Sequence, residues 1–295
     1  MIRLAVERDQ PLRRLAKRCQ SLLLPGLASL ALAGCSGLVN LAAPDSDAPI
    51  PPSQSNLASL TEVIQKHPDD PQAYNLRGSV EADSGNPEAA LADFNKAISL
   101  DANYAQAYAN RGLLHRQNAK LDQALADYNK AISIDGNYAA AYVGRGMVYR
   151  QQGNSVQALA DLNKAIALRP DTAQAYYNRG LLYQSERQHQ FAVDDFTAAL
   201  SLTTQKTDVF VARALSYLAL GDAKSAASDL DEAVQMQPQN LQAWASRGLA
   251  YERLGQKDKA AGSYAKALNI NDKYEPAKAG FARVGGKAGQ TYQTF

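Results

Sequence analysis

Cysteine and histidine are scarce in this 295-residue chain, which has two of the former and three of the latter. Both cysteines, Cys19 and Cys35, lie near the N-terminus, so no disulfide framework can hold the rest of the chain. The histidines, His67, His115 and His189, lack the spacing of metal ligands, and no Gly-x-Ser-x-Gly or His-Glu-x-x-His motif occurs. We therefore expect no enzyme, no metal and no small-molecule cofactor.

An excess of charge of one sign is also lacking. The chain has 31 Lys and Arg against 29 Asp and Glu, a formal net charge of +2. Basic residues are concentrated in the first 34 residues, so the remainder is slightly acidic. A nucleic-acid-binding surface normally shows a basic patch, and we therefore predict no nucleic-acid partner.

One apolar run occurs near the N-terminus, from Ser21 to Gly34, after a basic segment. It is too short for a relaxed membrane span but suits the core of a signal peptide. It ends in Leu32-Ala33-Gly34-Cys35, which resembles the lipobox of bacterial lipoproteins. That resemblance implies that residues 1–34 are a signal peptide and that Cys35 carries acyl chains anchoring the mature protein to a membrane. The alternatives are an ordinary signal peptide with a chance cysteine, or an uncleaved anchor.

The residues after Cys35 bear on where the protein resides. Ser36 follows the cysteine in place of the Asp that retains some lipoproteins in the inner membrane, so the resemblance favours a bacterial outer membrane, facing the periplasm. Residues 35–55 are rich in Pro, Ser and Ala and show no periodicity. We expect a flexible tether here, with a mean reach of roughly 25 Å.

From residue 71 the sequence repeats with a period of 34 residues. An aromatic residue occupies position 4 of each repeat: Tyr74, Tyr108, Tyr142, Tyr176, Phe210 and Trp244. Four residues later, at position 8, stand Gly78, Gly112, Gly146, Gly180, Ala214 and Gly248. Positions 20 and 27 are alanine in all six repeats, and position 24 is Phe94, Tyr128, Leu162, Phe196, Leu230 or Tyr264.

These spacings predict two amphipathic helices in each repeat. Positions 4 and 8 share one helix face, as do positions 20, 24 and 27, and the small residues allow close helix packing. The pattern closely resembles the tetratricopeptide repeat (TPR). This resemblance implies an all-α fold, a TPR superhelix or α-solenoid of six antiparallel helix pairs over residues 71–274. Sequence alignment further predicts capping helices within 56–70 and 275–284 and a flexible tail over 285–295.

Position 7 is arginine in every copy: Arg77, Arg111, Arg145, Arg179, Arg213 and Arg247. Position 23 is aspartate in the first five copies and Ser263 in the sixth. Helix geometry places both positions at one level on one side of the seam between the two helices, which predicts an Arg–Asp pair in each of the first five hairpins. The alternative is a row of arginines for an anionic ligand. Because Arg247 lacks its aspartate, we expect it to be free for a partner.

The TPR resemblance also implies a concave groove lined by positions 2, 5, 6, 9, 12 and 13 of the first helices. Amide, aliphatic, aromatic and basic side chains at these positions suit a peptide or a partner helix. The candidate binding residues are Arg247 together with Asn110, Leu113, Arg116, Gln117, Met147, Arg150, Gln151, Gln174, Tyr177, Asn178 and Leu181. Some family members grip a C-terminal carboxylate with Lys and Asn in this groove, but no Lys stands at position 2 or 5 here.

Together these features predict a membrane-anchored, periplasm-facing scaffold that holds envelope enzymes or assembly factors through protein–protein contacts. A structural component of a secretion, pilus or polysaccharide-export apparatus is the first alternative, and an enzyme is the second. The scaffold interpretation requires a protein or peptide ligand in the groove and a membrane contact through the acyl chains on Cys35.

Overall fold

The computed structural model describes residues 54–204, 206–287 and 289–292, and within them it contains fourteen helices and no strand. The helices are α1 (Gln54–Lys66), α2 (Pro71–Asp83), α3 (Pro87–Leu100), α4 (Ala105–Gln117), α5 (Leu121–Ile134), α6 (Ala139–Gln151), α7 (Ser155–Leu168), α8 (Ala173–Ser185), α9 (His189–Leu202), α10 (Thr207–Leu220), α11 (Ala223–Met236), α12 (Leu241–Arg253), α13 (Lys257–Ile270) and α14 (Glu275–Arg283). The predicted signal peptide and Cys35 lie outside the described residues.

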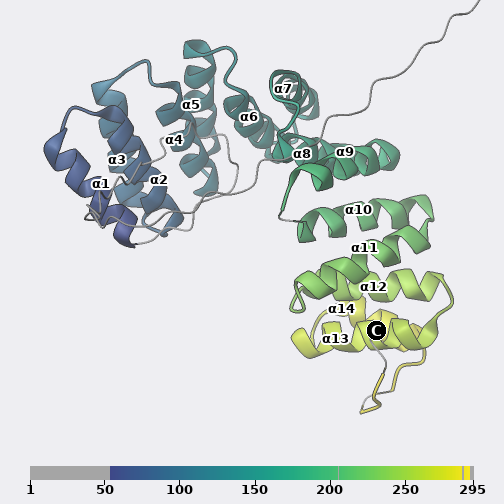
Figure 1. The fold of residues 1–295 in the computed structure, drawn as a ribbon. Helices are drawn as coiled ribbons and strands as arrows, with labels where there is room; N and C mark the ends of the chain where they lie inside the picture. Colours follow the sequence, from purple (N-terminus) through teal and green to yellow (C-terminus); the bar gives the residue numbers. More distant parts are fainter. Residues whose placement is uncertain (1–53, 205, 288, 293–295) are drawn as a thin grey trace, which may run out of the picture. The chain divides into compact units, whose positions relative to one another are not determined.

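Six antiparallel helix pairs stack in chain order, from α2–α3 to α12–α13 (Figure 1). Each first helix also contacts the first helix of the next pair, so the even-numbered helices from α2 to α12 form one continuous layer. Helix α1 packs on α2 at the start of the stack, and α14 packs on α12 and α13 at its end. The predicted all-α solenoid of six pairs with terminal capping helices is therefore confirmed.

Each pair is held close by the small residue at position 8 of its first helix. A Cβ atom added at Gly78 would lie 2.8 Å from the Phe94 ring, and one added at Gly180 would lie 2.7 Å from the Phe196 ring. Repeat five has alanine in this place, and there the opposing residue is Leu230 rather than an aromatic. Close helix approach therefore depends on the match between positions 8 and 24 of the same repeat.

Two tyrosines reach beyond their own pair. Tyr128 of α5 and Tyr264 of α13 are the two tyrosines at position 24, and each meets a glycine at position 6 of the next first helix. A Cβ added at Gly144 would lie 2.3 Å from the Tyr128 ring, and one added at Gly280 would lie 2.2 Å from the Tyr264 ring. The longer tyrosine thus fits only because the next helix has no side chain there.

The ends of the described region contain further contacts. Helix α1 begins at Gln54, so the last two residues of the predicted tether are helical. In the segment predicted as a tail, the Tyr292 ring packs edge-on against Phe281, with ring centres 5.7 Å apart. Among the described helices, none has both the length and the apolar character needed to cross a bilayer.

The Tyr128–Gly144 fit predicts a coupling between the two residues. Gly144→Ala should destabilise the protein, because overpacking costs about 1 to 3 kcal/mol whereas alanine in a helix returns only about 0.5 to 1 kcal/mol. In a Tyr128→Leu background the same change should instead stabilise, as the ring is gone. Chemical denaturation of the four proteins of this cycle measures the coupling; an equal effect of Gly144→Ala in both backgrounds would contradict the fit.

Candidate partner-binding surface

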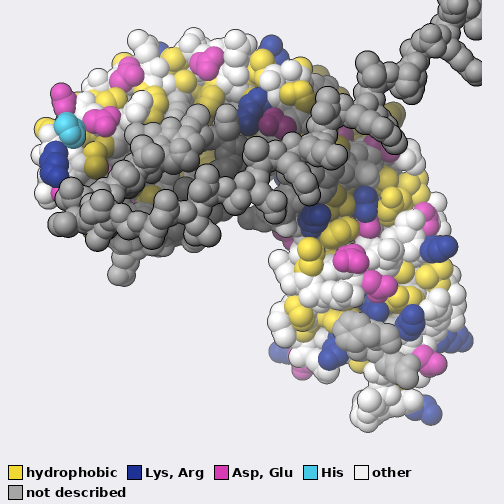
Figure 2. All heavy atoms as spheres, in the orientation of Figure 1, with side chains coloured by type: hydrophobic (Ala, Val, Ile, Leu, Met, Phe, Trp, Pro, Cys, Tyr) yellow, Lys and Arg dark blue, Asp and Glu magenta, His cyan; other side chains and the backbone are white. Residues whose placement is uncertain are grey.

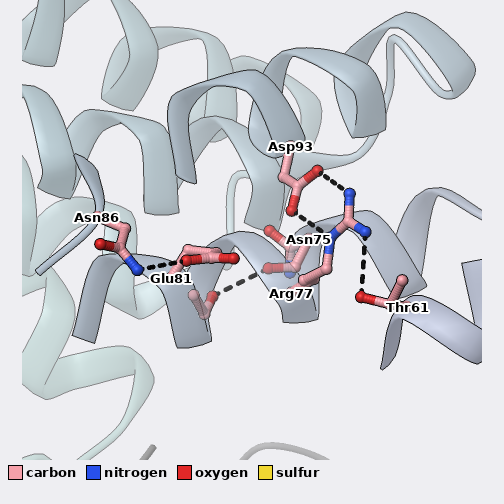
Figure 3. Close-up of polar contacts among 7 residues, drawn as sticks. Thr61, Asn75, Arg77, Glu81, Asn86 and Asp93 are labelled. Atoms are coloured by element: carbon pink, nitrogen blue, oxygen red, sulfur yellow. Dashed lines mark hydrogen bonds and ion pairs between the residues drawn. The ribbon is translucent and has the colours of Figure 1, made fainter. Parts of the chain in front are cut away.

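The arginine at position 7 forms a two-pronged ion pair with the aspartate at position 23 in each of the first five repeats. In repeat three, Arg145 Nε donates to Asp161 Oδ2 and Arg145 Nη2 donates to Asp161 Oδ1, both at 2.8 Å. Figure 3 shows the equivalent pair of Arg77 and Asp93, with both distances 2.7 Å. The other three pairs have distances of 2.6 to 2.8 Å. The predicted pairing is confirmed.

The same arginines make a second contact that the sequence analysis missed. The Nη1 atom of Arg145 donates to Asn129 Oδ1 at 2.7 Å, and Asn129 stands at position 25 of the preceding repeat. Asn95, Asn163 and Thr197 accept in the same way from the next arginine, and Thr61 of α1 accepts from Arg77 at 3.4 Å. The signal was present as a hydrogen-bonding side chain at every position 25 from repeat one to repeat five.

These arginines are thus fully engaged in the fold. Each guanidinium also lies over the aromatic ring at position 4 of its own helix, between 5.4 and 5.9 Å from the ring centre. Charge, hydrogen bonds and ring contacts together hold three helices to one side chain. The arginines at position 7 therefore do not form a row that is open to an anionic ligand.

The prediction for Arg247 was wrong. Its side chain is only 2% exposed, and its Nε donates to Asp231 Oδ1 at 2.6 Å while its Nη1 donates to Ser263 Oγ at 2.8 Å. Asp231 occupies position 25 of repeat five, where repeats one to four have asparagine or threonine. The carboxylate missing from position 23 of repeat six is thus supplied by the preceding repeat, and Arg247 is not available to a partner.

We call the layer formed by positions 2, 5, 6, 9, 12 and 13 of the first helices the first-helix surface. Leu113 is 39% exposed on it, and Gln117, Gln151 and Gln174 are also exposed. Six candidates are partly exposed: Asn110, Arg116, Met147, Arg150, Tyr177 and Leu181. Apart from Arg247, all eleven candidate binding residues lie on α4, α6 and α8, which belong to one layer. One of them, Asn178, is buried.

Two asparagines of this surface serve the fold. Asn178 is 2% exposed, and its Nδ2 donates to the Gln174 carbonyl oxygen at 2.8 Å, so the amide folds back along its own helix. Its assignment as a partner-binding residue was therefore wrong. Asn110 Nδ2 donates to Asn75 Oδ1 at 3.0 Å and joins α4 to α2.

The first-helix surface has two small hollows around Leu113. The larger has a volume of about 120 Å³ and is lined by Asn110, Leu113, Tyr128, Gly144, Met147 and Gln174, among others. The smaller has a volume of about 60 Å³, with Leu113 and Asn110 on the wall shared by both. Each hollow is large enough for a small side chain, so the surface offers shallow sockets rather than a cavity for a whole small molecule.

Arg116 and Arg150 stand at position 12 of repeats two and three. The Nε atom of each is buried without a hydrogen-bond partner, and neither arginine pairs with a carboxylate of the described residues. Arg150 Nη2 makes one long contact, 3.5 Å from Asn178 Oδ1. Burial lowers the pKa of Arg150 from its ordinary value, and the positive charge of Arg116 lowers this pKa further.

Tyrosine hydroxyls flank these two arginines. Burial raises the pKa of Tyr128 to about 12, and the adjacent Arg116 guanidinium opposes that shift. Burial also raises the pKa of Tyr177; the charge of Asp208 raises this pKa further, and the charge of Arg150 opposes the shift. Over the face in Figure 2, basic and acidic side chains are interspersed on the described surface.

Family profiles identify the repeats. Profiles described as TPR repeat or tetratricopeptide repeat match residues 78–119, 105–138, 146–185, 173–206 and 211–276. This chain is a tetratricopeptide-repeat protein. Such repeats are generally non-catalytic scaffolds that bind peptides or proteins in a groove. The part of the chain that the structure describes holds no cluster of side chains suited to a metal ion.

Solved structures share this TPR fold. A chain of the APC/C hetero-tetramer Cut9–Hcn1 is 17% identical with a TM-score of 0.70, over 78% of this protein and 46% of that chain. The present protein thus spans less than half of that relative. The pilF protein of Pseudomonas aeruginosa is 20% identical with a TM-score of 0.66, over 72% of this protein and 97% of that chain. A tetratricopeptide repeat protein from Parabacteroides merdae is also 20% identical, with a TM-score of 0.54 over 78% and 91% of the two chains. A comparison with curated protein sequences gives no significant match.

The position-7 contacts predict unequal effects of two aspartate substitutions. Asp161→Asn removes the carboxylate from a largely buried pair and should reduce the free energy of unfolding by about 1 to 3 kcal/mol. Asp171→Asn removes an exposed carboxylate 3.7 Å from Arg169 Nε. This change should alter the free energy of unfolding by less than about 0.5 kcal/mol. Urea denaturation compares the two variants, and similar losses would contradict a structural role specific to position 23.

Proposed function

We propose that this TPR protein is a lipid-anchored scaffold of the bacterial envelope, whose first-helix surface holds a segment of a partner protein on the periplasmic side of the membrane. One observation carries the binding half of this proposal. All six arginines at position 7 are bonded within the fold, whereas Arg116 and Arg150 on the first-helix surface have no carboxylate partner among the described residues.

The side chains around these arginines suit a peptide. Leu113, Met147 and Leu181 stand at position 9 of successive first helices and offer apolar contacts, one from each of α4, α6 and α8. The exposed amides of Gln117, Gln151 and Gln174 can donate and accept hydrogen bonds beside them. A ladder of apolar contacts flanked by amides and guanidinium groups favours an extended segment or the face of a helix.

The sequence before the tether supports the membrane half of the proposal. Leu32-Ala33-Gly34-Cys35 follows an apolar run, as in bacterial lipoproteins, and several acyl chains on one cysteine give stable anchoring where a single chain is marginal. A tether between that cysteine and α1 would hold the stacked repeats near the bilayer while leaving the first-helix surface accessible to partners.

Site-specific photocrosslinking in membranes tests the binding surface. A photoreactive amino acid replaces Leu113 or Leu181, both on the first-helix surface, and each should give a discrete adduct with the same partner protein. Val156 provides the matched control, because it is 81% exposed but lies on α7, a second helix. Adducts that form at Val156 as readily as at Leu113 would contradict binding through the first-helix surface.

The anchor has a separate test. Metabolic labelling with a radioactive fatty acid should label the native protein and a Cys19→Ala variant, since Cys19 precedes the apolar run and would be removed with the signal peptide. A Cys35→Ala variant should incorporate no label and should leave the membrane fraction. Labelling that survives Cys35→Ala, or a native protein without label, would overturn the lipoprotein assignment.

A further inference from the structure

Position 12 of the repeats shows how the fold satisfies polar side chains on the first-helix surface. In repeat four, Gln184 Nε2 donates to the Ala212 carbonyl oxygen and to Ser216 Oγ, both at 2.9 Å. In repeat six, Glu252 accepts from the Tyr264 hydroxyl at 2.6 Å and from Arg283 Nε at 2.8 Å. Repeats one and five have the apolar residues Ala82 and Leu218 at position 12. Outside repeats two and three, every polar side chain at this position is therefore hydrogen-bonded within the fold.

Arg116 and Arg150 break that pattern. Each has five N–H donors, yet the buried Nε of each has no partner. Arg116 interacts with the Tyr128 hydroxyl, and Arg150 Nη2 makes a long contact of 3.5 Å with Asn178 Oδ1. The two guanidinium groups are also close enough for the charge of Arg116 to lower the pKa of Arg150. Two like charges with unfilled donors destabilise the free protein, and an anion between them would relieve both costs.

The surroundings indicate what kind of anion fits. The Tyr128 hydroxyl interacts with Arg116, and Tyr128 is one of the residues that line the 120 Å³ hollow with Leu113 and Met147. Gly144 leaves room for that ring, because any side chain there would collide with it. Tyr177 is close enough to Arg150 to interact with it electrostatically. Tyr128 therefore connects the arginine donors to a hollow with apolar walls at Leu113 and Met147. This combination suits a carboxylate carried on a peptide better than a small inorganic ion.

We propose that Arg116 and Arg150 together bind a carboxylate of the partner segment, and that the neighbouring socket at Leu113 and Met147 receives an apolar side chain of the same segment. This inference rests on the function proposed above. Arginine suits this task because its planar fork matches a carboxylate. The carboxylate comes either from a Glu or Asp side chain or from a chain terminus, and both sources present the same group to the two arginines.

Fluorescent peptides binding to the full-length protein test this site. The first peptide carries glutamates among apolar residues and has blocked ends; the second has every glutamate changed to glutamine. The third is the glutamine peptide with a free C-terminal carboxylate. The glutamate peptide should bind at least about tenfold more tightly than its blocked glutamine counterpart, as expected for charge-assisted hydrogen bonds. Tight binding of the third peptide would identify a chain terminus as the source of the carboxylate.

Two double variants connect the binding to the arginines. Arg116→Gln with Arg150→Gln should weaken binding of the carboxylate peptide by about tenfold to a hundredfold and should reduce its dependence on salt. The matched control is Lys164→Gln with Arg187→Gln, which removes the same charge from exposed residues of α7 and of the α8–α9 turn. The control should bind like the native protein. Circular dichroism of both variants checks that the helices are retained.

The outcomes separate this inference from the broader function. If the glutamate and glutamine peptides bind equally, or if both double variants lose affinity equally, the carboxylate site is wrong. In that case crosslinks from Leu113 and Leu181 would still support a binding surface. If no partner crosslinks to that surface, the scaffold function fails, even where a glutamate peptide binds in vitro.

Discussion

One guanidinium group per repeat holds the stack together. The arginine at position 7 donates to both oxygens of an aspartate in its own hairpin, to a side chain of the preceding hairpin, and lies over an aromatic ring of its own helix. In repeat six the partners change but the principle holds, because Asp231 replaces the missing aspartate. Since one side chain joins three helices, the hairpins cannot slide relative to one another without breaking charge-assisted hydrogen bonds.

Against that background, the arginines at position 12 stand out. The same chain that surrounds every position-7 guanidinium with acceptors leaves the Nε atoms of Arg116 and Arg150 buried and unpaired. A neutral side chain at either position would avoid both desolvation and mutual repulsion. Unused binding capacity at an accessible surface is the usual physical sign of a ligand site.

The sequence predicted what happens within a repeat better than what happens between repeats. The pairing of positions 7 and 23 followed from helix geometry inside one hairpin. The acceptors at position 25, the pairing of Arg247 with Asp231 and the fit of Tyr128 to Gly144 all cross from one repeat to the next. Asn178 was misjudged for another reason: a helix wheel gives the direction of a side chain but not whether its amide folds back on its own helix.

The central claim is that arginines at position 7 stabilise this protein whereas those at position 12 are kept for a ligand. The most direct test measures the free energy of unfolding of Arg145→Gln and Arg150→Gln, two neutralised arginines on the same helix α6. The account predicts a loss of about 1 to 3 kcal/mol for Arg145→Gln, because a buried carboxylate loses its partner. It predicts no loss for Arg150→Gln, and a comparable loss in both variants would contradict it.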